Sequence, residues 1–126
     1  MPDPHPTCAV IGDVLNREKW ANKSLRAHQM AGYRCFPVHP NGGEVEGQPV
    51  YTSVSQIPER LNRITVYLRP SLALAALDEI AEKGCDELWL NPGVYTREVI
   101  ERAESLGLSV QTGCSIIDVG VSPGSL

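Results

Sequence analysis

The chain has 126 residues, of which 42% are hydrophobic and 21% are charged, and this composition suits one globular domain with a single core. No apolar run approaches the roughly 18 residues that a membrane-spanning helix needs, and the N-terminus lacks the basic and apolar regions of a signal peptide. We therefore expect a cytoplasmic protein with no membrane partner. The net charge of −4 argues against a nucleic-acid partner.

The charge is unevenly distributed along the chain. Residues 1–43 carry five basic and three acidic side chains, whereas residues 44–126 carry six basic and twelve acidic ones. The basic excess surrounds the loop after the first predicted strand. Because surface helices also carry such charges for solubility, this pattern is only a weak indication of an anionic ligand.

The four cysteines show no metal-binding pattern. They form no C-x-x-C pair and lie at least 27 residues apart, so we expect no metal site. In a reducing cytoplasm they are expected to be free thiols, and a free cysteine is most often a buried structural residue.

Short apolar runs alternate with amphipathic segments along the chain. The apolar runs predict strands at 8–11, 33–38, 64–68, 87–90 and 108–112. The periodic segments predict helices at 22–31, 72–83 and 97–106, with a short helical turn within 54–61. Ser71 and Thr96 are the predicted N-caps of the second and third helices. Residues 115–121 are expected to add a short extended piece.

This order of elements predicts an α/β fold. Strands separated by helices imply a parallel sheet with right-handed crossovers, and continuous apolar runs fit strands that are buried on both faces. We expect a doubly wound sheet of about five mainly parallel strands with helices on both faces. The expected boundaries are a disordered lead-in at 1–6, one domain at 7–120 and a disordered tail at 121–126.

In doubly wound sheets, ligands bind beyond the carboxyl ends of the strands. Proline and glycine fix the chain direction at such ends and let a ligand approach the backbone, although ordinary turn chemistry explains any single one equally well. The five predicted strand ends are Gly12-Asp13-Val14, His39-Pro40-Asn41, Arg69-Pro70, Asn91-Pro92-Gly93 and Gly113-Cys114-Ser115.

The first of these turns does not fit a dinucleotide cofactor. The G-x-G-x-x-G fingerprint would require glycine at positions 12, 14 and 17, which hold Gly12, Val14 and Arg17. The acidic residue expected after the second strand is also missing, because that position holds His39. The sequence therefore argues against a hydride-transfer enzyme.

The loop from Asp13 to Asn22 is longer than a dinucleotide turn and leads into a predicted helix. The backbone N–H groups and the dipole of a helix N-terminus favour an anion. Lys19 and Lys23 would add positive charge there, and Arg17 and Trp20 would cover a bound ligand.

Six segments in order resemble one family: "AVIG…NREKWANKSLR", "GYRCFPVHPN", "EVEGQPVYTSV", "YLRP", "LWLNPGV" and "AESLGLSVQTGCS". From about Thr7 to Val119, the chain resembles the small, stand-alone CoA-binding proteins. These are Rossmann-like domains related to the CoA-binding domain of the succinyl-CoA synthetase alpha subunit. The resemblance implies that coenzyme A or an acyl-CoA is the ligand.

The resemblance also implies a path for this ligand along the strand ends. The diphosphate would lie at the loop after the first strand, lined by Gly12, Asp13, Val14, Lys19, Asn22 and Lys23. The turn His39-Pro40-Asn41 would take the adenine end. The nucleotide and the pantetheine arm would be flanked by Leu68, Arg69 and Pro70 and then by Asn91, Pro92 and Gly93.

The phosphate loop departs from the family at two positions. Family members usually read Gly-Ala-Ser where this chain reads Gly12-Asp13-Val14, so a small residue is replaced by a carboxylate and a hydroxyl by an apolar side chain. A carboxylate aimed at a diphosphate would disfavour binding by about 1 kcal/mol or more. A scaffold that has lost CoA binding and acts through protein contacts, with Trp20, Trp89 and Tyr95 as anchors, is therefore an alternative.

No catalytic residue is predicted. His28 is expected to be a solvated helix residue, and His39 is tied by no motif to a nucleophile. Cys114, at the end of the last strand, is a minor candidate for pairing with the CoA thiol. We predict a non-catalytic domain that binds CoA or an acyl-CoA. A subunit of an acyl-CoA ligase-type enzyme is a further alternative, and a homodimer or an unidentified protein partner remains open.

Overall fold

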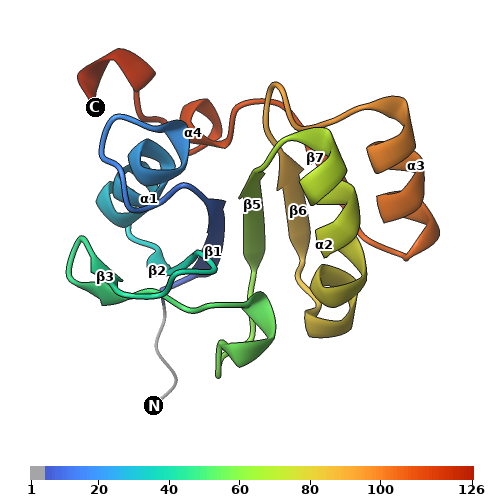
Figure 1. Ribbon diagram of the computed structural model, residues 1–126. Helices are drawn as coiled ribbons and strands as arrows, with labels where there is room; N and C mark the ends of the chain where they lie inside the picture. Colours follow the sequence, from blue (N-terminus) through green and yellow to red (C-terminus); the bar gives the residue numbers. More distant parts are fainter. Residues whose placement is uncertain (1–4) are drawn as a thin grey trace.

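The computed structural model describes residues 5–126 as an α/β domain built on one parallel sheet (Figure 1). The sheet order is β2-β1-β5-β6-β7, with all neighbouring strands parallel. The five strands are β1 (Thr7–Gly12), β2 (Arg34–Val38), β5 (Arg63–Tyr67), β6 (Glu87–Leu90) and β7 (Val110–Thr112). A small antiparallel hairpin, β3 (Glu44–Val45) and β4 (Gln48–Pro49), follows β2.

The sheet winds outward in two directions from its centre. From β1 the chain moves to β2 at one edge, and it then returns to β5 on the other side of β1 before continuing to β6 and β7. The strand order therefore reverses between β1 and β5, which is where doubly wound sheets place their ligands. The predicted fold class is confirmed.

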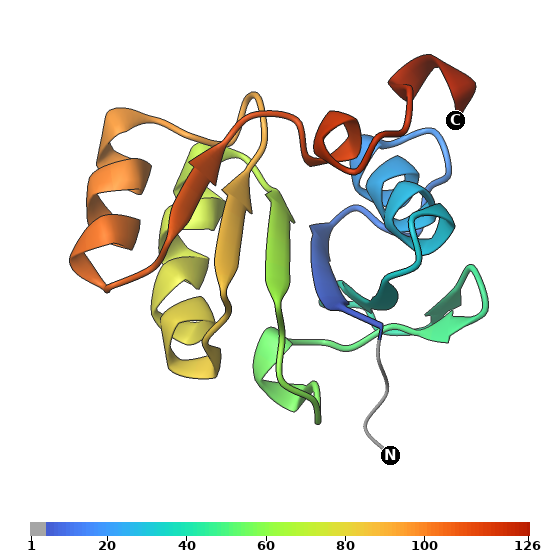
Figure 2. The ribbon, with the colours of Figure 1, turned by 180° about the vertical axis from the view of Figure 1, so that it is seen from behind.

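Helices cover both faces of the sheet, as Figures 1 and 2 show from opposite sides. One face carries α1 (Trp20–Met30) and the short α4 (Ser115–Asp118), whereas the other carries the 3₁₀ turn η1 (Val54–Gln56), α2 (Pro70–Lys83) and α3 (Arg97–Ser105). Successive residues of β1 divide between the two faces. Cys8 and Val10 pack with the α1 cluster, and Ala9 and Ile11 pack with the α2–α3 cluster. This two-sided burial explains why the strand is apolar throughout.

The larger core lies between the sheet and the α2–α3 layer. Leu77 and Ile80 of α2 are almost fully buried against strand residues such as Ile64 and Leu88. Each such side chain contributes about 1.5–3 kcal/mol by its burial. The α2–α3 layer therefore holds the carboxyl ends of β1 and β5 in fixed positions.

The first turns of the second and third predicted helices differ in how they are capped. Thr96 is confirmed as an N-cap, because its hydroxyl oxygen accepts a 3.2 Å hydrogen bond from the Val99 backbone N–H. The prediction for Ser71 is wrong, since α2 begins at Pro70 with Arg69 as its N-cap residue. Proline is suited to the first helical position because its missing N–H would have no helical partner there.

The C-terminal segment is helical where an extended piece was predicted. Ser115–Asp118 forms α4, and Pro123–Ser125 forms the 3₁₀ turn η2 in the region expected to be an unstructured tail. Of the predicted lead-in, residues 1–4 lie outside the described residues, and the Pro6 carbonyl accepts a 2.8 Å hydrogen bond from the Arg34 backbone N–H. Among residues 5–126, no helix is long and apolar enough to cross a membrane.

A buried polar cluster lies between α1, α4 and the sheet. The Arg63 guanidinium donates to Glu87 at 3.0 Å and to Asp118 at 2.7 Å, and its Nη1 lies 3.4 Å from Nε2 of His28. His28 also hydrogen bonds to the Ser24 carbonyl at 2.8 Å and is fully buried, so the prediction of a solvated His28 is wrong. This cluster fixes α1 and α4 to the sheet.

Candidate functional site

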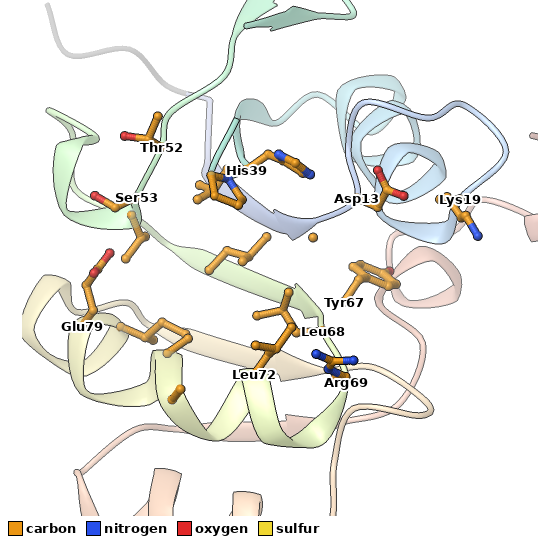
Figure 3. Close-up of a pocket in the computed structure, with 18 residues that line it drawn as sticks. Asp13, Lys19, His39, Thr52, Ser53, Tyr67, Leu68, Arg69, Leu72 and Glu79 are labelled. Atoms are coloured by element: carbon orange, nitrogen blue, oxygen red, sulfur yellow. The ribbon is translucent and has the colours of Figure 1, made fainter. Parts of the chain in front are cut away.

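A cleft of about 1030 Å³ opens where β1 and β5 end, at the point where the strand order reverses (Figure 3). Its walls come from the ends of β1, β2 and β5, the segment at Thr52–Val54 and one face of α2. Seven of the predicted site residues line it: Gly12, Asp13, Lys19, His39, Pro40, Leu68 and Arg69. The structure thus brings together residues from three of the predicted strand ends.

The two ends of the cleft differ in character. Figure 3 shows Asp13, Lys19 and Arg69 at one end, and Thr52, Ser53 and Glu79 at the other. The floor between them is largely apolar. It includes Leu72, an apolar side chain on the face of α2 that lines the cleft, which is 46% exposed. Such a cleft suits an elongated ligand that has an anionic group and an apolar or aromatic part.

The charged end of the cleft also contains the beginnings of two helices. Lys19 is the N-cap residue of α1 and Arg69 that of α2, and neither helix has a side-chain cap. The first backbone N–H groups of α1 have no partner within the helix, and together with the helix dipole they favour an anion. α2 offers fewer such groups, because Pro70 has no N–H and the Leu72 N–H donates to the Arg69 carbonyl oxygen at 3.0 Å, so it contributes mainly its dipole. Both N-cap side chains are cationic, which adds to this preference.

Gly12 lets β1 approach its neighbours closely at the mouth of the cleft. Its φ is +147°, and a Cβ atom there would lie 2.6 Å from the Tyr67 carbonyl oxygen and 3.1 Å from the Ala21 side chain. No side chain fits this space without movement of the backbone. Gly12 is therefore required by the contact between β1, β5 and α1.

The loop after β1 is held by side chains behind it. Asn22 is fully buried, and its Nδ2 donates a 2.7 Å hydrogen bond to the Val14 carbonyl oxygen while its Oδ1 accepts from Arg26 at 2.8 Å. Arg26 in turn donates to the Arg17 carbonyl oxygen at 2.9 Å. The Val14 side chain is buried in the α1 core cluster. Val14 and Asn22 thus position the loop and do not line the cleft.

Two charged side chains of this region make contacts outside the cleft. Arg17 forms an ion pair of 2.9 Å with Glu46 of the β3–β4 hairpin, which ties the loop to the far side of β2. The Lys23 ammonium lies 4.6 Å from the centroid of the Trp20 ring, in a cation–π contact. Lys23, which was predicted to line the phosphate site, does not line the cleft.

The turn after β2 contributes two of its three predicted residues. His39 and Pro40 line the cleft, whereas Asn41 contributes its backbone N–H, which donates to Nδ1 of His39 at 3.1 Å. Nδ1 is therefore an acceptor, and Nε2 carries the proton in the neutral ring. This arrangement orients the imidazole at the edge of the cleft.

A second, smaller cavity of about 230 Å³ lies on the other side of Tyr67. Tyr67 lines both cavities, so the two are neighbours along the carboxyl edge of the sheet. The smaller one is lined by Trp20, Tyr67, Asn91, Pro92, Cys114, Ile116 and Pro123. It contains the predicted residues Asn91 and Pro92, whereas Pro70 and Gly93 line neither cavity.

The side-chain amide of Asn91 is hydrogen bonded to other residues of the protein. Its Nδ2 donates to the Thr65 hydroxyl at 2.7 Å and to the Val66 carbonyl at 2.9 Å, and its Oδ1 accepts from both the backbone N–H and the hydroxyl of Ser115 at 3.0 Å. All of its hydrogen-bonding positions on these atoms are used. Asn91 therefore joins β5, β6 and α4, and its contact with a ligand would be through its surface only.

Several lining residues were not predicted from the sequence, among them Tyr67, Thr52 and Ser53. The sequence does contain a pattern for the wall that α2 forms. The wall residues Leu72, Ala75, Ala76 and Glu79 recur at helical spacing, and all of them line the cleft. The sequence does not separate this wall from a core face, because an apolar cleft wall and a core face have the same spacing. Within residues 5–126, no group of three or more His, Cys, Asp or Glu side chains could hold a metal ion.

The fold and the cleft define a class of protein: a doubly wound α/β domain with a nucleotide-sized site at its switch point. The model of the CoA binding domain family matches residues 6–120. The chain therefore belongs to the CoA binding domain family.

Individual relatives of similar length share the sequence or the fold over most of the chain. The chain is 24% identical over 102 residues to the uncharacterized protein YneT of Bacillus subtilis, covering 81% of this chain and 76% of YneT. A hypothetical protein from Pyrococcus horikoshii superposes with a TM-score of 0.83 at 25% identity, covering 92% of this chain and 82% of that one.

A much larger protein shares the fold. The dinucleotide-forming acetyl-coenzyme A synthetase 1 of Ca. Korarchaeum cryptofilum superposes with a TM-score of 0.73 at 21% identity. The match covers 82% of this chain but only 25% of that chain. The fold of this small domain therefore also occurs as a part of a multidomain enzyme.

Proposed function

We propose that this protein is a non-catalytic domain that binds coenzyme A or an acyl-CoA in the cleft at the switch point. The observation that carries the proposal is the meeting of two uncapped helix N-termini with the cationic side chains of Lys19 and Arg69 at one end of that cleft. Membership of the CoA binding domain family supports CoA over other anionic nucleotides.

The remaining parts of the cleft suit the remaining parts of CoA. The diphosphate lies at the charged end, against the loop that follows Gly12. The adenine lies toward His39 and Pro40, where the cleft is bounded by the apolar face of α2. The pantetheine arm runs in the opposite direction, past Tyr67 toward Asn91 and Pro92.

One residue of the cleft opposes this ligand. Asp13 is exposed and lines the charged end, so its carboxylate would repel a diphosphate bound there. The two helix N-termini and the two cations outweigh a single carboxylate. We therefore expect Asp13 to weaken binding and not to abolish it.

The histidines support a non-catalytic role. His28 is buried and hydrogen bonded within its own helix, and His39 orients its Nδ1 toward the backbone of its own turn. Cys114 lines only the smaller cavity. In this proposal the chain holds and presents the ligand, and no group of the chain transfers a proton or an acyl group.

Isothermal titration calorimetry tests the proposal, with CoA, acetyl-CoA, ADP and NAD as ligands. We expect CoA and acetyl-CoA to bind, with ADP weaker and NAD the weakest. Mass spectrometry of small molecules released from the freshly purified protein provides an independent measurement. The absence of heat with any CoA species at millimolar concentration, together with no released CoA, would show that this domain is not a CoA carrier.

A role as a subunit of a larger acyl-CoA enzyme is the second candidate. It is favoured by the shared fold with one quarter of the acetyl-coenzyme A synthetase chain and by the exposure of Trp20 and Tyr95, which are 53% and 40% exposed. Affinity purification from its own cells distinguishes the two candidates. A stoichiometric partner protein would favour the subunit role, and recovery of the domain alone with CoA would favour the carrier.

A further inference from the structure

The smaller cavity is a natural continuation of the CoA path. It shares Tyr67 with the large cleft, and it lies at the ends of β6 and β7, on the side away from the adenine end. The arm of a CoA whose diphosphate lies near Lys19 ends in this direction. The terminal thiol, or an acyl group attached to it, would therefore arrive at the smaller cavity.

The walls of this cavity are held in place without a ligand. The Ser115 backbone N–H donates to Asn91, and Asp118 accepts from Arg63 at 2.7 Å, so both ends of α4 are tied to the sheet. These ties fix Ile116, which is fully buried, against one side of the cavity. A preformed cavity selects its occupant by size and polarity, because little reorganisation is needed on binding.

The size of the cavity limits what can enter. Its volume is about 230 Å³, less than a quarter of the 1030 Å³ of the large cleft. The end of the pantetheine arm takes part of this space. A short acyl chain would fit beside it, and the far end of a long chain would extend into solvent and gain no further burial.

The polarity of the cavity limits the occupant further. None of its lining residues carries a charge, and burial raises the pKa of the Tyr67 hydroxyl, which therefore stays neutral. The polar groups of Asn91 are already hydrogen bonded within the protein. The Lys23 ammonium lies over the Trp20 ring and is not part of the lining. A carboxylate placed here would lose its hydration without gaining a partner.

We propose that the smaller cavity is an acyl pocket that selects short, uncharged acyl groups of about two to four carbons on CoA. The proposal rests on the proposed CoA function and gives it a ligand class. Acetyl-, propionyl- and butyryl-CoA are its ligands, and acyl groups with a terminal carboxylate, such as succinyl, are disfavoured.

Calorimetric titration of the wild-type protein with a series of CoA thioesters tests the proposal. We expect affinity to rise about fourfold for each methylene from acetyl- to butyryl-CoA and to rise no further at octanoyl-CoA. Succinyl-CoA, which has the same number of carbons as butyryl-CoA, should bind at least tenfold more weakly than butyryl-CoA.

The outcomes separate this proposal from the proposed function. Three results would show that the acyl-pocket proposal is wrong while CoA binding stands. CoA and all thioesters could bind equally well, succinyl-CoA could bind as tightly as butyryl-CoA, or affinity could keep rising to octanoyl-CoA. If neither CoA nor any thioester binds, both proposals are wrong.

A cavity-filling variant locates the effect. Cys114→Leu adds volume to the wall, so we expect the ratio of butyryl-CoA to CoA affinity to fall by about tenfold. Cys114→Ser, which keeps the size of the side chain, is the matched control and should keep most of that ratio. If Cys114→Leu folds and its ratio of butyryl-CoA to CoA affinity is unchanged, the acyl group does not bind in the smaller cavity. If Cys114→Leu does not fold, the titration of the wild-type protein with CoA thioesters still tests the proposal.

Discussion

The side-chain amide of Asn22, in the first turn of α1, donates a 2.7 Å hydrogen bond to the backbone carbonyl oxygen of Val14. This bond fastens the middle of the candidate phosphate loop to the helix whose N-terminus the loop covers. Because Asn22 is fully buried, no water replaces the donor when it is removed. The bond therefore determines both the shape of the loop and part of the stability of the fold.

Asn22→Asp tests this bond, since it keeps the acceptor for Arg26 and replaces the donor with an oxygen that faces the Val14 carbonyl. We expect the free energy of unfolding to fall by about 1–3 kcal/mol, and CoA affinity to fall with it. Urea unfolding and calorimetry are the measurements. Asn41→Asp makes the same change at an exposed position and should stay within about 0.5 kcal/mol of the wild type. Equal midpoints for the two variants would contradict the assigned role.

Gly12 and Gly32 allow the effect of close contact to be separated from that of backbone conformation. Both have positive φ, but a Cβ atom at Gly12 would lie 2.6 Å from the Tyr67 carbonyl oxygen, whereas one at Gly32 would meet nothing within 4 Å. We expect Gly12→Ala to lower the free energy of unfolding by about 3 kcal/mol or more, and Gly32→Ala by about 1 kcal/mol. Thermal or urea unfolding measures both. A Gly12→Ala protein as stable as Gly32→Ala would mean that β1 and β5 are less close than described.

The charge of Asp13 is expected to weaken the binding of a diphosphate. Asp13→Asn removes that charge without changing the size of the side chain, and should tighten CoA binding by about fivefold at low salt. The gain should shrink as ionic strength rises. Glu18→Gln makes the same charge change at an exposed position that does not line the cleft, and should change affinity much less. If both variants behave alike, Asp13 acts only through the net charge.

Lys19 provides the opposite test at the same end of the cleft. Lys19→Gln removes a cation that lines the cleft and should weaken CoA binding by about fivefold or more, with a reduced dependence on salt. Lys23→Gln, which removes a cation engaged with the Trp20 ring outside the cleft, is the matched control. A larger loss in Lys23→Gln than in Lys19→Gln would move the phosphate site away from the cleft.

Stability should depend on pH through His28. Burial, assisted by the neighbouring Arg63 guanidinium, lowers the pKa of His28 from 6.5 to about 4, although the hydrogen bond to Ser24 opposes the shift. The unfolded chain therefore binds a proton below pH 6.5 that the folded chain does not bind until about pH 4. This contribution is fully present above pH 6.5 and is lost as pH falls, by on the order of 3 kcal/mol at pH 4.

Urea unfolding at several pH values between 4 and 7.5 measures this loss. His28→Gln keeps a polar side chain at the position and removes the titrating group, so its free energy of unfolding should vary less over the same range. If the wild type and His28→Gln show the same pH dependence, carboxyl groups and not His28 are responsible for it.

The sequence predicted which strand ends form the site better than it predicted which side chains of a loop face the cleft. Parallel strands all end at the same edge of the sheet, so the five predicted strand ends supplied nine of the residues that line the two cavities. These are Gly12, Asp13, His39, Pro40, Leu68, Arg69, Asn91, Pro92 and Cys114. The loop after β1 added Lys19. The family resemblance also implied that Val14 and Asn22 lie at the ligand, but neither lines the cleft. Which side of a loop a residue faces depends on what packs behind it, and that information is not local.

The same limit applies to α4 and His28. The segment after Cys114 is too short to show a helical period, and it becomes a helix because Ser115 and Asp118 are held by Asn91 and Arg63 from distant parts of the chain. His28 was expected in water because a lone histidine on a helix usually is. Arg63, 35 residues away, is its buried neighbour.

The sequence by itself determined the order of the elements and the parallel sheet, because hydrophobic periodicity and turn chemistry are local properties. It also indicated the family, through the resemblance of six short segments in order. The tertiary structure alone decided which residues of the phosphate loop face the cleft, that Tyr67 separates two cavities, and that the smaller cavity has no charged wall. Those features arise from packing between residues tens of positions apart, where volume and hydrogen-bond partners, not local pattern, set the direction of each side chain.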